Sequence, residues 1–520
     1  MNPSRVFMST TTKRLTSTLL TIPALRGLGK RIVERKIAEK LAQEEESSST
    51  PGMVTDQGQM LRNLLGVVEK WLATGNVKHG TLRRFIDSFA SMASAENQAA
   101  IRAFEEKYGF STPRFVTISP TMKCNLRCTG CYAASTANTD FSLSHETFDK
   151  IIRQQKELWG SHFTVISGGE PFLWKDGEVN LLDVFADHPD TFFLVYTNGT
   201  FITEKVANRL AELGNVTPCV STEGFEEETD ERRGKGVHRK VLRAFENLRK
   251  AGVLYGTSIT VTSKNKDIVF SKEFMDFYFR DYGVYYGWIF QYMPVGRGPS
   301  LELMPTPEQR VDMWRKMQHW IKHDHLFLAD FWNSATLCNG CMSAGRKGGY
   351  VYIDWNGDVM PCVFNPYSTH NIVEVFAKGG TISDVIAAPY MQKIRKWQAD
   401  YYDQGEPDGK PGNMLMPCPL RDHHQVIRDI IREAGARPTH ESAREALEDE
   451  EYRRGMIAYG KRLAELTTPM WREEYLGEVS GADEAGPGGP DTKRHPAETT
   501  TSEEAVSEGA ATPVSATGKG

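Results

Sequence analysis

Three cysteines fall in one short segment, directly after an apolar run at residues 115–119. They are Cys124, Cys128 and Cys131, with the spacing Cx3Cx2C. Three thiolates in one loop can hold three irons of a [4Fe–4S] cluster and leave the fourth iron open. The same thiols with one more ligand, such as His145, could instead hold a zinc ion. The triad therefore predicts a metal centre at the end of a strand.

The chain around this triad alternates between short apolar runs and amphipathic helical patterns. The predicted strands are 115–119, 163–167, 192–196, 216–221, 254–262 and 286–291, and the predicted helices are 145–158, 181–187, 203–213, 237–251 and 272–282. This order implies a parallel sheet, because parallel neighbours need crossover helices. In such sheets the chemistry lies at the carboxyl ends of the strands. The triad therefore lies at the edge where an active site is expected.

The composition narrows the class of protein further. The chain has 520 residues, of which 40% are hydrophobic and 25% charged, as in globular proteins with real cores. The formal net charge of -5 provides no basic field, so no nucleic-acid partner is expected. No apolar run approaches the roughly 18 residues that a membrane-spanning helix needs.

Both ends of the chain differ from its centre. Residues 1–33 hold six basic residues and no acid, and threonines and Pro23 interrupt any signal-peptide core. This segment could lie on an anionic membrane surface, act as an organellar transit peptide, or be a frayed tail. We expect a cytoplasmic protein, with this segment as the candidate contact to the inner membrane surface. Residues 480–520 have too little apolar surface to fold and are predicted to be disordered.

A second group of cysteines follows the alternating region. It consists of Cys338, Cys341, Cys362 and Cys418, and a hairpin with an Asn356-Gly357 turn is predicted at residues 350–360. Four thiolates suffice for one auxiliary cluster, although a cluster on three cysteines or a zinc knuckle that begins at Cys338 would also fit. Tight clustering of cysteines indicates metal ligation in a reducing compartment. Cys219 stands apart and is expected in the core.

Further motifs occur where the predicted strands end. The segment Gly168-Gly169-Glu170-Pro171 follows the second strand, and Thr197-Asn198-Gly199 follows the third. Ser221-Thr222-Glu223-Gly224 follows the fourth, and Arg233-Gly-Lys-Gly236 comes shortly after it. With the triad, these motifs resemble the radical S-adenosylmethionine (radical SAM) enzymes over roughly residues 113–300. Two glycines let the chain approach a ligand closely, and a carboxylate accepts hydrogen bonds from an ammonium group.

The resemblance implies a role for each of these residues. Cys124, Cys128 and Cys131 would be the catalytic cluster ligands, and the residues expected to contact SAM are Gly168, Gly169, Glu170, Asn198, Ser221, Glu223 and Arg233. Glu170 would accept from the methionine amino group, and Arg233 would pair with the SAM carboxylate. One position departs from the family, because Gly130 stands where an aromatic residue commonly packs against adenine.

The resemblance also implies the architecture. We expect an α/β fold, a partial (β/α)6 TIM-type barrel with an N-terminal helical segment and a small C-terminal cluster-binding domain. The spacing from Cys341 through Gly357 to Cys362 resembles the SPASM and twitch domains, which bind auxiliary clusters. The predicted divisions are a basic segment with a linker at 1–51, a helical prelude at 52–112, the radical SAM core at 113–330, the auxiliary cluster domain at 331–435, C-terminal helices at 436–479 and the tail at 480–520.

The implied activity is reductive cleavage of SAM at a [4Fe–4S] cluster, which gives a 5′-deoxyadenosyl radical for C–H functionalisation. An electron donor of low potential, such as ferredoxin or flavodoxin, would be needed. A peptide or protein substrate is favoured, and the alternative substrates are a lipid or membrane-associated molecule and a cofactor precursor. The alternative to an enzyme is a non-catalytic interaction protein stapled by zinc. A run of aromatic residues is expected to line a barrel strand and shape the substrate cavity: Tyr285, Tyr286, Trp288, Phe290 and Tyr292.

Overall fold

The computed structural model describes residues 50–478, apart from residues 76, 78, 92, 93 and 407, together with residues 31, 34, 35 and 39. Apart from those four residues, the predicted basic N-terminal segment and the predicted tail at 480–520 lie outside the described residues. Within the part that the structure describes, no helix is both long enough and apolar enough to cross a membrane.

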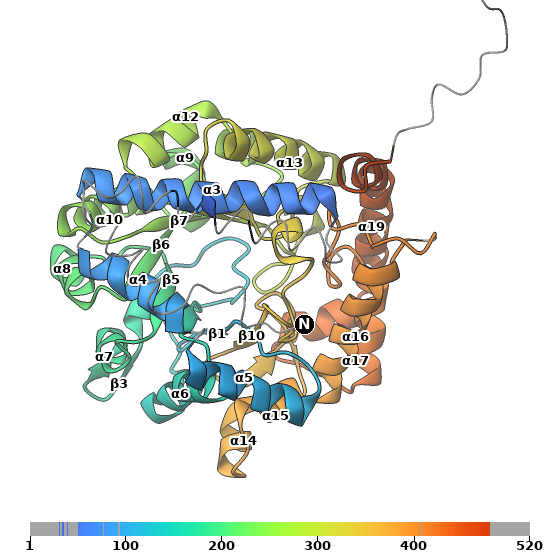
Figure 1. The fold of residues 1–520 in the computed structure, drawn as a ribbon, viewed down its shortest axis with the longest axis horizontal. Helices are drawn as coiled ribbons and strands as arrows, with labels where there is room; N and C mark the ends of the chain where they lie inside the picture. Colours follow the sequence, from blue (N-terminus) through green and yellow to red (C-terminus); the bar gives the residue numbers. More distant parts are fainter. Residues whose placement is uncertain are drawn as a thin grey trace, which may run out of the picture. The chain divides into compact units, whose positions relative to one another are not determined.

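An open sheet of ten mostly parallel strands forms the centre of the described fold, in the order β13-β11-β10-β1-β2-β5-β6-β7-β8-β9 (Figure 1). The six strands of the partial barrel run parallel to one another: β1 (Phe115–Ile118), β2 (Phe163–Ile166), β5 (Phe192–Thr197), β6 (Val216–Thr222), β7 (Gly256–Val261) and β8 (Gly287–Gln291). The edge strands β9 and β13 do not pair with each other, so the barrel is not closed. The predicted partial (β/α)6 barrel is confirmed.

Helices connect these strands in the predicted alternation, with ends that differ by one or two residues. They are α6 (His145–Trp159), α7 (Leu181–Asp187), α8 (Glu204–Leu213), α9 (Glu226–Arg233), α10 (Val237–Ala251), α11 (Lys266–Val269) and α12 (Lys272–Met275), the last continued by η4 (Asp276–Asp281). Helix α9 was not predicted, because it has no apolar periodicity. Its acidic first turn and basic last turn stabilise it through the helix dipole instead.

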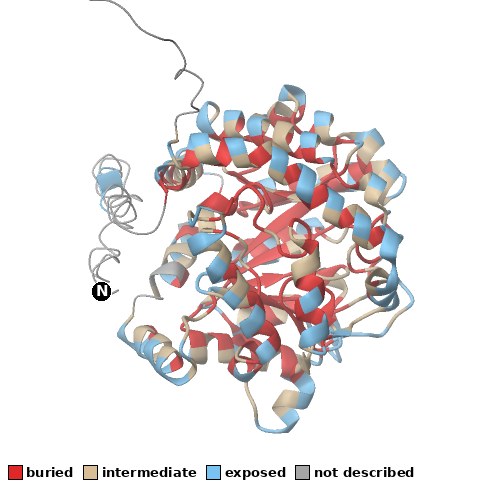
Figure 2. Cartoon of the chain, turned by 90° about the vertical axis from the view of Figure 1, so that its right-hand side faces the viewer, coloured by how far each residue is buried: buried red, intermediate tan, exposed pale blue. Residues whose placement is uncertain are grey.

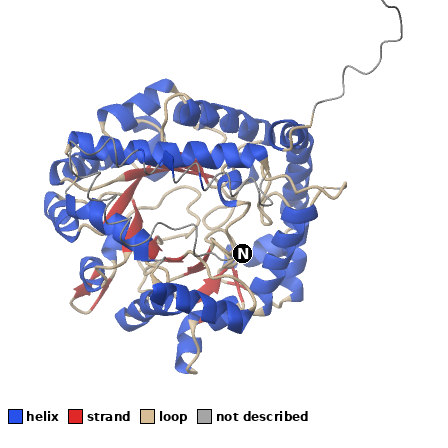
Figure 3. Ribbon diagram, viewed as in Figure 1, coloured by secondary structure: helices blue, strands red, loops and turns tan. Residues whose placement is uncertain are grey.

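Buried residues follow the central strands (Figure 2). All seven residues of β6 are buried, as expected for a parallel strand that is covered on both faces. Cys219 lies in this strand with no exposed surface, which confirms it as a core residue. Helices lie around the strands (Figure 3).

The N-terminal helices cover the amino ends of the barrel strands. The predicted helical prelude is confirmed as α3 (Pro51–Thr74), α4 (His79–Ser91) and α5 (Ala95–Tyr108). Phe85 of α4 packs edge-on against Phe192, the first residue of β5, with ring centroids 5.1 Å apart. Asn97 of α5 contacts His162, the residue before β2, at 3.0 Å between Nδ2 and Nε2. The carboxyl ends of the strands, where the motifs lie, are at the opposite side of the sheet.

The segment with the second cysteine group adds strands to this sheet. The predicted hairpin is confirmed as β10 (Tyr350–Ile353) and β11 (Asp358–Met360). Strand β10 pairs in parallel with β1, in a register that places Tyr350 opposite Phe115. Strand β9 (Leu328–Asp330), which was not predicted, pairs in parallel with β8. The boundaries proposed for an auxiliary domain stay a prediction.

The remaining elements are helices of various lengths and strands of two residues. They are η3 (Pro171–Leu173), β3 (Lys175–Asp176), β4 (Val179–Asn180), η5 (Leu301–Leu303), α13 (Pro307–Lys322), η6 (Ala335–Cys338), β12 (Tyr367–Ser368), β13 (His370–Asn371), α14 (Ile372–Ala377), α15 (Ile382–Ile386), α16 (Pro389–Gln404), α17 (His424–Glu433), β14 (Arg437–Pro438), α18 (Glu441–Glu448), α19 (Glu450–Met470) and η7 (Trp471–Tyr475).

One buried amide fastens the two strands that lead into the triad and the glycine motif. Gln155 of α6 is fully buried, and its Oε1 accepts from the Val116 backbone N–H of β1 at 2.9 Å. Its Nε2 donates to the Phe163 carbonyl of β2 at 2.9 Å. Gln155 therefore satisfies backbone groups of both strands at once.

Replacing Gln155 with leucine should lower the free energy of unfolding by about 2–3 kcal/mol, because backbone groups of β1 and β2 lose their partners in the core. Urea denaturation of the purified chain measures this change. The control is Arg153→Ala on an exposed part of the same helix, where a change below about 0.5 kcal/mol is expected. Equal effects of the two substitutions would contradict the assigned role of Gln155.

Candidate active site

The cysteine triad lies in the loop after β1, and all three cysteines line one cavity of about 310 Å³. Five other predicted SAM-contacting residues also line this cavity: Gly168, Gly169, Asn198, Ser221 and Arg233. They come from the carboxyl ends of β2, β5 and β6 and from the end of α9. The structure therefore brings together most of the site that the motifs predicted.

The glycine motif packs directly on the backbone of the cysteine loop. The Gly169 N–H donates to the Thr121 carbonyl at 2.9 Å, and the Glu170 N–H donates to the Lys123 carbonyl at 2.8 Å. A Cβ atom at Gly169 would lie 2.2 Å from the Lys123 carbonyl oxygen. Any side chain at this position would therefore push the two loops apart.

Glu170 holds the glycine motif to the turn after β5. Its carboxylate accepts from Thr197 Oγ1 at 2.7 Å, from the Asn198 N–H at 2.8 Å and from the Phe172 N–H at 3.2 Å. The side chain is fully buried. Burial raises the pKa of its carboxyl group and these hydrogen bonds partly oppose the rise, so that the pKa is about 7. Glu170 does not line the cavity, so its contact with the methionine amino group stays a prediction.

Glu223 is bound by two neighbouring arginines of α9. Arg233 donates to both carboxylate oxygens, at 2.5 and 2.6 Å, and Arg232 donates to Oε1 at 2.8 Å. Both arginines line the cavity, whereas Glu223 does not. The predicted role of Glu223 as a SAM contact stays a prediction, and the structure shows it as the ion-pair partner of Arg233.

Near Cys128, the two guanidinium groups of Arg232 and Arg233 face the single carboxylate of Glu223. Burial raises the pKa of the Cys128 thiol, and the charges of Arg233 and Arg232 oppose this effect. A thiolate or an anionic ligand at this end of the cavity is stabilised by these charges. The sequence motif identified Arg233 but not Arg232.

A loop after β8 binds the backbone of the cysteine loop through hydrogen bonds. Arg297 Nη1 donates to the Cys128 carbonyl at 2.9 Å, and the Arg297 N–H donates to the Cys131 carbonyl at 3.0 Å. At Gly296, where φ is +80°, a Cβ atom would lie 2.3 Å from the carbonyl oxygens of Cys131 and Tyr132. Sequence reasoning missed both residues, and the available signal was a glycine-containing turn directly after a barrel strand.

The unusual Gly130 is explained by Tyr292, which follows β8. Gly130 has a φ of +62°, and a Cβ atom there would lie 2.4 Å from Cε2 of the Tyr292 ring. A larger residue therefore does not fit at position 130. On the other side of Cys131, the Tyr132 hydroxyl lies 2.6 Å from Ser167 Oγ and accepts from the Gly168 N–H. Tyr292 and Tyr132 both line the cavity.

Aromatic side chains line the part of the cavity within the barrel. They are Phe115, Phe163, Tyr196, Trp288, Phe290, Phe331, Tyr350 and Phe364. Trp288, Phe290 and Tyr292 thus shape the cavity as predicted, whereas Tyr285 and Tyr286 precede β8 and do not line it. Among the described residues that line the cavity, only Arg232 and Arg233 have charged side chains.

Three cysteines of the second group line a separate small cavity of about 20 Å³. They are Cys341, Cys362 and Cys418. Cys338 does not line this cavity, and its thiol donates to the Gly340 carbonyl at 3.3 Å. Burial raises the pKa of the Cys362 thiol to about 12 and also raises that of Cys418.

Both cysteine groups have the donor chemistry of iron–sulfur sites. No group of three or more His, Cys, Asp or Glu side chains in the described part of the chain has a geometry that could hold a single metal ion. Each group nevertheless supplies three thiols to one cavity, and thiolates are the usual protein ligands of iron–sulfur clusters. The residues present therefore fit such clusters.

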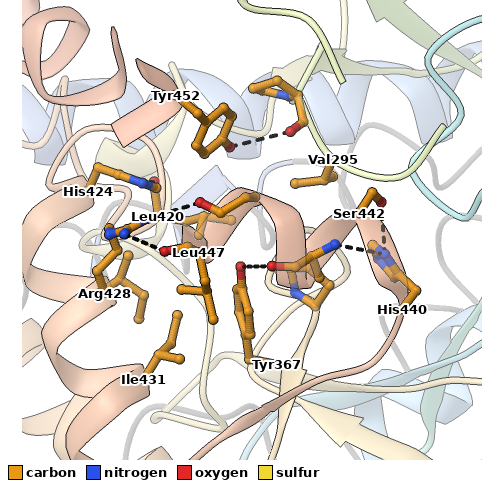
Figure 4. Close-up of a pocket in the computed structure, with 15 residues that line it drawn as sticks. Val295, Tyr367, Leu420, His424, Arg428, Ile431, His440, Ser442, Leu447 and Tyr452 are labelled. Atoms are coloured by element: carbon orange, nitrogen blue, oxygen red, sulfur yellow. Dashed lines mark hydrogen bonds between the residues drawn. The ribbon is translucent and has the colours of Figure 1, made fainter. Parts of the chain in front are cut away.

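A further cavity, of about 10 Å³, lies between α17, α18 and β12 (Figure 4). Arg428 there donates to the Ala446 and Leu447 carbonyls, and the Tyr367 hydroxyl donates to the Ala443 carbonyl. The space suits one water molecule, so this cavity is not a substrate site.

The structure defines an α/β protein with a thiol-lined cavity at the carboxyl ends of its parallel strands. Comparison with known proteins identifies the family. The sequence profile of the Radical SAM superfamily matches residues 118–267. Mycofactocin maturase MftC of Mycobacterium tuberculosis is 30% identical over 292 residues, which cover 55% of this chain and 71% of MftC.

A second relative and one solved structure are also similar to this chain. The AdoMet-dependent heme synthase of Methanosarcina barkeri is 25% identical over 290 residues, which cover 51% of this chain and 80% of that enzyme. The crystal structure of Streptococcus suis SuiB bound to S-adenosylmethionine superposes with a TM-score of 0.49 and 18% identity, over 62% of this chain and 76% of SuiB. The chain belongs to the radical SAM superfamily, whose members are iron–sulfur enzymes. This membership removes the alternative of a non-catalytic zinc-stapled protein.

Replacing Gly169 with alanine should lower the iron bound at the triad and the formation of 5′-deoxyadenosine by about tenfold, because overpacking against Lys123 costs about 1–3 kcal/mol. Iron analysis and chromatography after anaerobic reconstitution measure both quantities. The control is Gly66→Ala, since Gly66 lies in α3 and has open space around it. Unchanged iron and product in the Gly169 variant would show that the close approach of the two loops is dispensable.

Proposed function

We propose that this enzyme cleaves SAM reductively at a [4Fe–4S] cluster held by Cys124, Cys128 and Cys131 and functionalises a C–H bond of a peptide or protein. The observation that carries this proposal is the single cavity that contains the triad at one end and an aromatic interior at the other. When bound, the cluster and SAM supply the radical chemistry.

The residues of the chain would hold SAM and exclude water. Gly168 and Gly169 line the cavity and leave room for the backbone of the cysteine loop, and Asn198 and Ser221 supply polar groups at the cavity wall. Arg233, fixed by Glu223, presents positive charge for the SAM carboxylate. The aromatic interior keeps water from the reacting groups.

The cavity lining supports the substrate class. An uncharged, apolar group can enter the barrel, whereas a buried charge would find no partner beyond Arg232 and Arg233. An apolar side chain of a peptide or protein meets this requirement, and MftC is named a maturase. A lipid substrate is the alternative. The N-terminal segment that would favour a lipid lies outside the described residues, so membrane contact stays a prediction.

The second cysteine group would hold one auxiliary [4Fe–4S] cluster. Cys341, Cys362 and Cys418 are its proposed ligands because they line one cavity. Cys338 lies three residues before Cys341 and is the candidate for the fourth ligand. The electron for SAM cleavage would come from a donor such as ferredoxin or flavodoxin in the cytoplasm.

Replacing Cys124 with alanine should abolish 5′-deoxyadenosine formation and leave about four of about eight irons, because the auxiliary cluster remains. Anaerobic reconstitution, iron counting and a dithionite assay measure both. The matched variant is Cys418→Ala, which should also lose about four irons but still form 5′-deoxyadenosine. Reductive SAM cleavage by the Cys124 variant would overturn the assignment of the triad.

Deuterium transfer distinguishes the substrate classes. A pool of short peptides with perdeuterated leucine, valine, phenylalanine or tyrosine should yield deuterated 5′-deoxyadenosine by mass spectrometry, because these side chains fit an apolar cavity. A matched pool with perdeuterated aspartate or lysine should yield none. Deuterium arriving only from vesicles of perdeuterated phospholipid would replace the peptide proposal with the lipid alternative.

A further inference from the structure

Tyr350 forms part of the wall between the two cysteine-lined cavities. It is the first residue of β10, is 2% exposed, and lines both the large cavity and the small one. Three other residues also line both: Met293, Phe331 and Phe364. Among these four, Tyr350 alone has a side chain with a hydrogen-bond donor.

The position of the Tyr350 ring is fixed from the side of the large cavity. Tyr350 is paired with Phe115 in the parallel register of β1 and β10. The two rings are stacked, with centroids 5.1 Å apart and planes 3° apart. The Phe331 ring packs edge-on at 6.3 Å. This packing leaves the ring little freedom to turn its hydroxyl elsewhere.

The hydroxyl of Tyr350 is directed toward the second cysteine group. Its oxygen is buried and has no hydrogen-bond partner of acceptable geometry among the described residues, although the Val363 backbone N–H lies near it. The Cys362 thiol is a side-chain hydrogen-bonding neighbour of this hydroxyl, and both residues line the small cavity. A buried hydroxyl that donates no hydrogen bond costs about 1–3 kcal/mol.

We propose that Tyr350 donates a hydrogen bond to the sulfur of Cys362 when this cysteine ligates the auxiliary cluster, and that it thereby raises the reduction potential of that cluster. This inference rests on the proposed auxiliary cluster. Hydrogen bonds to the sulfurs of an iron–sulfur cluster stabilise its more negative, reduced form. Tyr350 is thus a positioning residue that belongs to both cavities, with its ring beside the substrate and its hydroxyl beside the cluster.

The chain offers a matched control two residues further along the same strand. Tyr352 is 3% exposed and lies on the same face of β10. Its hydroxyl donates to Ser119 Oγ at 2.8 Å, and Tyr352 lines neither cavity. Removing this hydroxyl deletes a buried polar group from β10 without touching the second cysteine group.

The experiment is a redox titration, followed by electron paramagnetic resonance, of the reconstituted full-length chain and its Tyr350→Phe and Tyr352→Phe variants. The signal of the auxiliary cluster is identified in the Cys124→Ala background. We expect Tyr350→Phe to lower the reduction potential of the auxiliary cluster. At a fixed solution potential, the ratio of reduced to oxidised auxiliary cluster should then fall by about threefold or more. Tyr352→Phe should leave the potential unchanged.

A second variant distinguishes loss of the hydrogen bond from misfolding. Incorporation of 3,5-difluorotyrosine at position 350 keeps the ring and strengthens the donor, so it should shift the auxiliary potential upward. An unchanged potential in Tyr350→Phe with full iron content would overturn the inference and leave the proposed function intact. About four irons in the parent chain, all lost on substitution of Cys124, would overturn the auxiliary cluster and the inference with it, while radical SAM cleavage would stand.

Discussion

The active site depends on the backbone contact between the cysteine loop and the Gly168-Gly169 motif. Two backbone hydrogen bonds join these loops, and Gly169 lies so close to Lys123 that no Cβ atom can be accommodated. Glu170 then binds the turn after β5, and Arg297 holds the opposite side of the cysteine loop. The geometry of the triad is therefore set by neighbouring strand ends rather than by the loop's own sequence, as is usual where a rigid sheet carries flexible functional loops.

Much of this arrangement was visible in the sequence because it follows from local patterns. The alternation of apolar runs and amphipathic helices predicted the six barrel strands, and the motifs lay where those strands end. Pairings between distant segments were not visible. The parallel pairing of β10 with β1 has no local signal, and the charged helix α9 has no hydrophobic period. Arg232, Gly296 and Arg297 were missed because their importance arises only where separate loops meet.

Electrostatics divides the large cavity into two parts. At the end with the triad, Arg232 and Arg233 outnumber Glu223, which suits thiolates, a negatively charged cluster and a carboxylate. Within the barrel the lining is mostly aromatic and carries no charge, although Thr117, Ser258 and Thr260 add hydroxyl groups, and such a lining suits an uncharged group. The same strands supply both parts, because inward-facing residues near their amino ends are apolar and the loops beyond their carboxyl ends are polar. SAM and substrate would thus meet at the boundary between two dielectric environments.

The pairing of β1 with β10 has a consequence for biosynthesis. Strand β1, which leads into the triad, leaves the ribosome early, but its neighbour β10 is translated much later. Until then β1 has one unsatisfied edge, the arrangement that natural sheets avoid because it invites association with other chains. Completion of the sheet must wait for the segment that carries the second cysteine group. Nascent chains of this enzyme would therefore depend on protection of that edge during synthesis, and a fragment that ends before β10 would keep it exposed.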